Sequence, residues 1–130
     1  MRALLLALAT ALAACSQTVE LGGGSGTATL NGEWVMATRA LRAPTITFAD
    51  DGASGFAGCN RWFGQYTRNG DRLTFSAIGA TRMACDEPAM SIERNFLGAL
   101  EATRAARVEG NTLILLDAEG AEQGRFLRAP

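Results

Sequence analysis

Three cysteines, Cys15, Cys59 and Cys85, carry the most distinctive chemistry in this sequence. A thiol acts as a catalytic nucleophile when a neighbouring base activates it, and that base is most often histidine. The 130-residue chain contains no histidine. Ser-His-Asp catalysis, Cys-His catalysis and every zinc site that uses imidazole are therefore excluded. We expect no enzymatic activity, no metal and no cofactor, so the cysteines need other roles.

Cys15 ends a leader-like segment. Residues 3–14 form an apolar run of alanine and leucine that only Thr10 interrupts, behind the positive start Met1-Arg2. The run is shorter than the roughly 20 residues of a membrane span, and it fits the apolar core of a secretory signal. It ends in Leu12-Ala13-Ala14-Cys15, which matches the lipobox of bacterial lipoproteins. We predict a signal peptide over 1–14 and lipidation of Cys15, with palmitate as one acyl chain; an ordinary signal peptide with an accidental cysteine is the alternative.

The next segment predicts where the protein lies. Residues 15–30 contain Gly22-Gly23-Gly24-Ser25-Gly26, a flexible tether whose reach is roughly 20 Å. Ser16, not aspartate, follows the cysteine, which favours outer-membrane sorting in a bacterium with two membranes. We expect a domain over 31–130, anchored by the lipid in the cell envelope and facing the periplasm.

Composition narrows the class of partner. The 12 basic residues are all arginine and are scattered, and the net charge is −1. Nucleic-acid binding needs a basic stripe or patch, so we expect no nucleic-acid partner. About 100 residues suffice for one domain with a modest core, which a covalent cross-link would help.

Secretion places Cys59 and Cys85 in an oxidising compartment, where cysteines usually pair. A disulfide between them closes a loop of 26 residues, which contributes about 3 to 4 kcal/mol on the chain-entropy model. We predict this disulfide; two free, buried thiols are the alternative.

The aromatic, glycine-rich stretch 55–66 and the segment 81–85 surround these cysteines. Asn60 is suited to a left-handed conformation or to bonding the nearby backbone. An exposed Trp62 beside Arg61 would form an interaction patch, whereas a buried Trp62 would belong to the core. Candidate motif and interaction residues are Gly58, Asn60, Arg61, Trp62, Gly64, Tyr66, Thr81, Arg82 and Met83.

The two stretches Gly58-Cys59-Asn60-Arg61…Gly64-Gln65-Tyr66 and Thr81-Arg82-Met83-Ala84-Cys85 resemble the motifs of the META domain family, which includes the heat-inducible HslJ-like envelope lipoproteins. Phe63 adds one residue relative to the compact form of the first motif. The resemblance covers residues 31–128. It implies a β-rich antiparallel fold with one packed helix, an envelope location, and links to heat stress, novobiocin resistance and, in parasites, virulence. It implies no catalytic residue. The family also occurs beside lysozyme-inhibitor-type domains.

Short alternating segments separated by turn residues predict strands on both sides of one helix. Turn signals stand at 31–32, 50–52, 69–71, 109–111 and 117–120. Glycines 55 and 58 suggest a close backbone approach or a bulge. The most apolar run, 112–116, predicts a strand buried on both faces.

The helix is expected over about 87–103, with Asp86 as N-cap and Pro88 in the first turn. Ile92, Phe96, Ala99, Leu100 and Thr103 form one apolar stripe, and Glu93 falls outside it. Gly98 would allow close packing on the sheet.

These elements predict an α+β, mostly β fold: a curved antiparallel sheet or partly closed barrel with one packed helix. For function, we expect a non-catalytic envelope module that binds a protein or a cell-wall component. One alternative is a carrier of a small apolar ligand, which would need a cavity lined by Phe48, Phe56, Phe75 and Leu115. Another is a protective protein of the lysozyme-inhibitor type.

Overall fold

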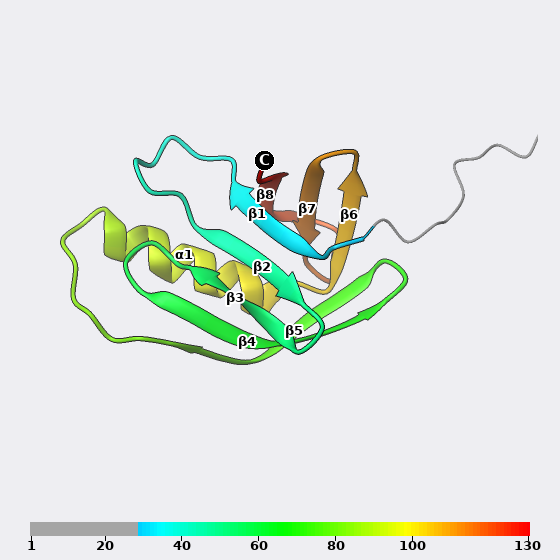
Figure 1. Cartoon of the computed structure of the whole chain (residues 1–130), viewed down its shortest axis with the longest axis horizontal. Helices are drawn as coiled ribbons and strands as arrows, with labels where there is room; N and C mark the ends of the chain where they lie inside the picture. Colours follow the sequence, from blue (N-terminus) through cyan, green and yellow to red (C-terminus); the bar gives the residue numbers. More distant parts are fainter. Residues whose placement is uncertain (1–28) are drawn as a thin grey trace, which may run out of the picture.

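The computed structural model describes residues 29–130 as eight strands and one helix in a closed antiparallel barrel (Figure 1). The strands follow one another around the barrel in chain order, and β8 pairs with β1. The predicted signal peptide, Cys15 and most of the tether lie outside the described residues. The elements are β1 (Gly32–Met36), β2 (Thr45–Ala49), β3 (Gly52–Phe56), β4 (Arg61–Asn69), β5 (Arg72–Ala80), α1 (Ala89–Ala102), β6 (Ala105–Glu109), β7 (Thr112–Leu116) and β8 (Glu122–Arg128).

Tight turns at the predicted positions connect the strands. Gly70 joins β4 to β5 and Gly110 joins β6 to β7, and both have left-handed φ angles, 61° and 60°. This conformation suits glycine because a side chain would be strained there. Short turns of this kind make sequential strands into antiparallel neighbours.

The barrel is weakest between β5 and β6, which pair through a single register match, Arg72 with Ala105. Helix α1 lies between these two strands in the sequence and packs against the concave side of the sheet (Figure 1). The expected fold class is therefore confirmed, and the sheet closes further than a partly closed barrel.

A chain of aromatic rings fills the interior. Neighbouring ring centroids lie 5.0 to 6.3 Å apart along the series Tyr66, Phe48, Phe75, Trp62, Phe96 and Phe126. Phe48, Phe75 and Leu115 belong to this packed core, whereas Phe56 lies outside it. Three of the four residues named for the carrier alternative are therefore packed in the core, an arrangement that does not favour a ligand cavity there.

Strand β7 is buried on both faces, as predicted, because the consecutive residues Leu113, Ile114 and Leu115 are all buried. Leu113 and Leu115 point into the core. Ile114 lies on the other face, where its cross-strand neighbours are Arg107 and Arg125. The aliphatic stems of arginines can cover such a position while their charged ends stay in water.

The helix differs from its prediction in two ways. Pro88, not Asp86, is the N-cap, and the Glu87 carboxylate accepts the Ser91 N–H at 2.9 Å, so the prediction of Asp86 as the cap is wrong. Asp86 contributes only its backbone carbonyl, which accepts the Ala89 N–H. Gly98 is exposed and a Cβ there would contact nothing within 4 Å, so it does not serve close packing on the sheet.

Candidate functional site: a disulfide-framed groove

The turn between β3 and β4 presses directly against the backbone of α1. Gly58 in this turn has a φ of 135°, and a Cβ at this position would lie 2.9 Å from the Glu93 nitrogen and 3.0 Å from the Ala89 carbonyl oxygen. Such distances leave no room for a side chain. The predicted close backbone approach at Gly58 is therefore confirmed, and its partner is the helix.

Asn60 joins this turn to the segment 81–85. Its Oδ1 accepts the Met83 N–H at 2.6 Å and the Thr81 hydroxyl at 3.2 Å. Its Nδ2 donates to the Met83 carbonyl at 3.1 Å. Asn60 is buried and does not have a positive φ, so of its two expected roles it bonds the backbone. The side chain pairs with the Met83 backbone much as a neighbouring strand would.

Glu93 completes the cluster from the helix, although the helical stripe placed it outside the core. It is 6% exposed. Its Oε1 accepts the N–H groups of Asn60 and Cys59 at 2.6 and 3.2 Å, and its Oε2 accepts Asn60 Nδ2 at 2.8 Å. Burial raises the pKa of a carboxylate, but hydrogen bonds from Asn60 and Cys59 outweigh burial and lower the pKa of Glu93. The expectation that Glu93 faces away from the core is wrong because these donors replace its water.

The predicted Cys59–Cys85 disulfide is present, with the two Cα atoms 6.0 Å apart. It ties the β3–β4 turn to the end of the 81–85 segment, beside the Asn60 hydrogen bonds. The turn, this segment and the start of α1 are thereby held together by covalent, polar and steric contacts. We call this cluster of Gly58, Cys59, Asn60, Thr81, Met83, Cys85 and Glu93 the frame.

The remaining predicted site residues do not join one patch. Trp62 is 1% exposed and its indole N–H donates to the Thr45 carbonyl, so of its two alternatives Trp62 belongs to the core and forms no exposed patch with Arg61. Strand alternation sends Trp62 inward and leaves Arg61 and Phe63 outside. Gly64 is buried, and Tyr66 packs on the core while its hydroxyl donates to the Ala49 carbonyl. Arg82 is exposed.

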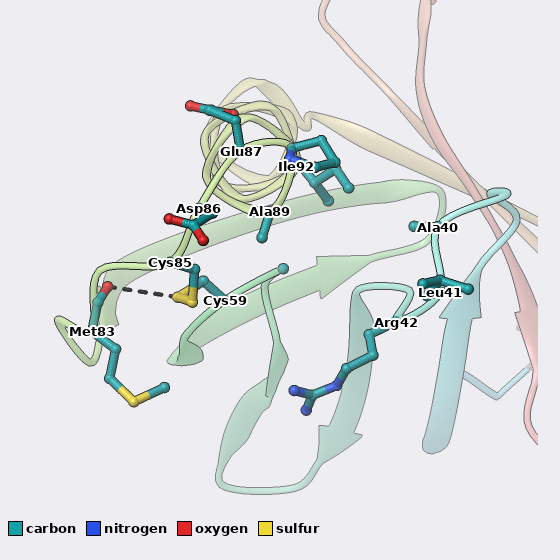
Figure 2. A pocket seen from close by; sticks show the side chains of 12 residues that line it. Ala40, Leu41, Arg42, Cys59, Met83, Cys85, Asp86, Glu87, Ala89 and Ile92 are labelled. Carbon is teal, nitrogen blue, oxygen red and sulfur yellow. Dashed lines mark hydrogen bonds between the residues drawn. A yellow bond between two sulfur atoms is a disulfide. The ribbon is translucent and has the colours of Figure 1, made fainter.

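A groove of about 440 Å³ runs along the frame, which we call the disulfide groove. The loop 40–42 forms one wall, and the disulfide and the start of α1 form the other (Figure 2). Leu41 is fully exposed and Met83 is 61% exposed, both at this groove. The lining residues are Ala40, Leu41, Arg42, Gly58, Cys59, Met83, Cys85, Asp86, Glu87, Pro88, Ala89 and Ile92.

The family model described as META domain matches residues 25–130, which includes the whole frame. The chain belongs to the META domain family. Six motif residues of this META domain thus belong to one structural unit: Gly58, Cys59, Asn60, Thr81, Met83 and Cys85.

Solved structures share this fold. An NMR structure of a protein from Burkholderia xenovorans has 30% sequence identity and a TM-score of 0.63, with 76% of this chain and 82% of that chain covered. A second NMR structure has 21% identity and a TM-score of 0.59, with 75% and 89% covered, and shows likeness of fold alone. No curated protein matches this chain.

A second depression of about 570 Å³ adjoins the disulfide groove of the META domain and shares Arg42, Cys59 and Met83 with it. Phe56, Arg61 and Thr81 complete its lining. We call it the arginine pocket. Together the two depressions form one continuous apolar surface with charged groups at its ends.

The described part of the chain contains neither a metal-binding cluster nor a membrane-spanning helix. No group of three or more cysteine, aspartate or glutamate side chains within residues 29–130 is arranged to hold a metal ion. Helix α1 lacks the length and apolar character to cross a membrane, and the described residues contain no other helix.

Proposed function

We propose that this protein is an envelope lipoprotein whose META domain is a non-catalytic module that docks a partner protein in the disulfide groove. The observation that carries the proposal is the exposure of Leu41 and Met83 on opposite walls of a groove with a rigid base. Exposed apolar side chains gathered at one concave site are typical of interaction surfaces. A base locked by a disulfide and by Glu93 loses little conformational entropy on binding.

The position of the groove supports an anchored arrangement. The described chain begins at residue 29 beside the start of β1, whereas the loop 37–44 and the segment 81–88 lie at the opposite end of the domain (Figure 1). A tether that leads from a lipidated Cys15 to residue 29 would hold the domain at the end remote from the groove. The groove would then face away from the membrane, toward partners in the periplasm.

The chemistry of the frame supports a non-catalytic role. Glu93 is its buried carboxylate, and both of its oxygens accept hydrogen bonds from Asn60 or Cys59. A general base needs a free lone pair directed at a substrate. The Glu93 carboxylate therefore stabilises the fold.

The anchor is tested by the intact mass of the protein purified from membranes of its own host. The proposal predicts a chain that starts at Cys15 and carries acyl groups. A mass that retains residues 1–14 without acyl groups would contradict the anchored arrangement.

The docking role is tested by complementation of a deletion strain. The double variant Leu41→Ser/Met83→Ser removes the exposed apolar groups of the groove, and Phe63→Ser/Leu127→Ser removes two exposed apolar groups elsewhere, which are 54% and 51% exposed. We expect the control to restore survival after heat shock or novobiocin treatment and the groove variant to fail, with equal protein levels. Equal restoration by both would contradict docking at the groove.

A further inference from the structure

The arginine pocket contains one aromatic ring, Phe56, and two arginines, Arg42 and Arg61. The Arg42 guanidinium carbon lies 4.2 Å from the centroid of the Phe56 ring, which is a cation–π contact. Arg61 is the direct cross-strand partner of Phe56 in the β3–β4 pairing, and both line the pocket. Directly opposed residues of two strands have neighbouring side chains on the same face. Two arginines therefore line the same depression as one apolar surface.

These two arginines have no acidic partner within residues 29–130. The ion pairs described there join Arg94 to Glu87, Arg107 to Glu109 and Arg125 to Glu122. No acidic residue lines the arginine pocket, which is otherwise formed by Phe56, Cys59, Thr81 and Met83. A planar guanidinium fork is matched by a carboxylate, so the pocket is complementary to an anion with an apolar group next to it.

The adjoining disulfide groove extends the site in one direction. It is lined by apolar side chains such as Leu41 and Ile92, and Asp86 and Glu87 lie across the groove from Arg42 (Figure 2). Glu87 is already paired with Arg94. The continuous surface is thus positive at one end and negative at the other. An extended peptide places successive side chains at regular intervals, so it can fill two adjoining depressions.

We propose that the arginine pocket binds the C-terminal carboxylate of a partner peptide between Arg42 and Arg61, and that the apolar residues before this carboxylate lie along Phe56, Met83 and the disulfide groove. This inference rests on the proposed docking function and names the chemistry of the partner. Recognition would combine the apolar fit with charge-assisted hydrogen bonds, and each exposed arginine would contribute modestly.

The test uses the full lipoprotein in nanodiscs and fluorescein-labelled hexapeptides whose last two residues are drawn from leucine, isoleucine and phenylalanine. Each peptide is made with a free C-terminal carboxylate and as the carboxamide, and Kd is measured by fluorescence anisotropy. We expect the free acids to bind about tenfold more tightly than the amides. Arg42→Gln and Arg61→Gln should each reduce this difference, whereas Arg72→Gln, an exposed arginine on β5 outside both depressions, should preserve it.

Several outcomes would overturn the inference. Equal affinity of acids and amides would show that the pocket does not recognise a carboxylate. Docking in the groove would be unaffected by this result, because the complementation experiment tests it separately. Absence of binding by every peptide would overturn the peptide assignment. Binding of dodecanoate that Arg61→Gln abolishes, without binding of the peptides, would assign the pocket to a lipid instead. Unchanged melting temperatures of the arginine variants confirm that each effect is local.

Discussion

At the scale of single residues, the buried carboxylate of Glu93 decides how the β3–β4 turn meets the helix. A buried charge is costly unless hydrogen bonds replace its water, and here three donors from Cys59 and Asn60 do so. The sequence alone could not predict this contact, since Asn60 and Glu93 are 33 positions apart and the helical stripe of apolar residues excludes Glu93. For Asn60, by contrast, the residue type indicates two roles, a left-handed conformation or bonding to the nearby backbone, and the second is the one observed.

Glu93→Gln tests this arrangement. The amide keeps the shape but removes the charge, and its NH2 group would face the Nδ2 donor of Asn60 or the backbone donors. We expect a loss of about 1.5 to 3 kcal/mol in the free energy of unfolding at pH 7. Chemical denaturation at pH 7 measures this loss, and an unchanged midpoint and slope would show that the carboxylate contributes nothing.

The lowered pKa of Glu93 also predicts how the effect depends on pH. A carboxylate whose folded pKa lies below its unfolded value stabilises the fold fully above the unfolded pKa, about 4.3. This contribution is lost as the pH falls through the folded pKa. The difference between wild type and Glu93→Gln should therefore shrink as the pH is lowered below about 4. A difference that stays constant between pH 7 and pH 3 would contradict the assigned cause.

At the scale of elements, the position of α1 depends on the absence of a side chain at Gly58. Gly58→Ala would place a methyl group against the backbone of Glu93 and Ala89 and would strain a φ of 135°. We expect a loss of more than about 2 kcal/mol in the free energy of unfolding. The neighbouring backbone cannot yield without moving the helix.

Gly98→Ala is the matched control in the same helix. Its added methyl group meets nothing within 4 Å. Alanine has a higher helix propensity than glycine, so we expect a gain of about 0.5 to 1 kcal/mol. Thermal melts of the two variants should shift in opposite directions. Shifts of the same sign and size would contradict the close contact at Gly58.

The elements show what patterning can predict. Turn residues and alternation predicted the strands, and the 3.6-residue period predicted the helix, because these patterns depend on local sequence alone. The prediction of the helix cap was wrong, because Pro88 occupies the N-cap position and the Glu87 carboxylate accepts the Ser91 N–H in place of Asp86. Strand alternation also accounts for the inward direction of Trp62, which pairs with Gly55 across the strands and whose indole N–H reaches the Thr45 carbonyl.

At the scale of the whole molecule, the disulfide restrains the loop that contains β4 and β5. The bond spans 26 positions. Its loss raises the conformational entropy of the unfolded chain and so lowers the free energy of unfolding by about 3 to 4 kcal/mol. We expect Cys59→Ala/Cys85→Ala, or reduction of the wild type, to lower the melting temperature by roughly 15 °C or more. Calorimetry with and without reductant measures this, and reduction should not affect the double variant. An unchanged melting temperature of the reduced wild type would contradict the role of the bond.

The groove itself could not be predicted from sequence. Leu41 lies in a loop with no pattern, and it lines the same groove as Met83 and Ile92 only because the barrel closes and brings the loop 40–42 near the start of α1. Four of the candidate motif residues, Gly58, Asn60, Thr81 and Met83, belong to the frame, and the other five lie outside it. Of the two exposed apolar residues at the groove, Met83 belongs to a motif and Leu41 does not.

Site-specific photo-crosslinking in living cells tests the central claim most directly. A benzoylphenylalanine replaces Leu41 in the groove of the full lipoprotein and, in the control, Leu127, which is 51% exposed on β8. Docking predicts a discrete adduct with an envelope protein from position 41, weakened by Met83→Ser and absent from position 127. The same adducts from both positions, or none from position 41, would contradict the claim that this groove is the binding surface of the domain.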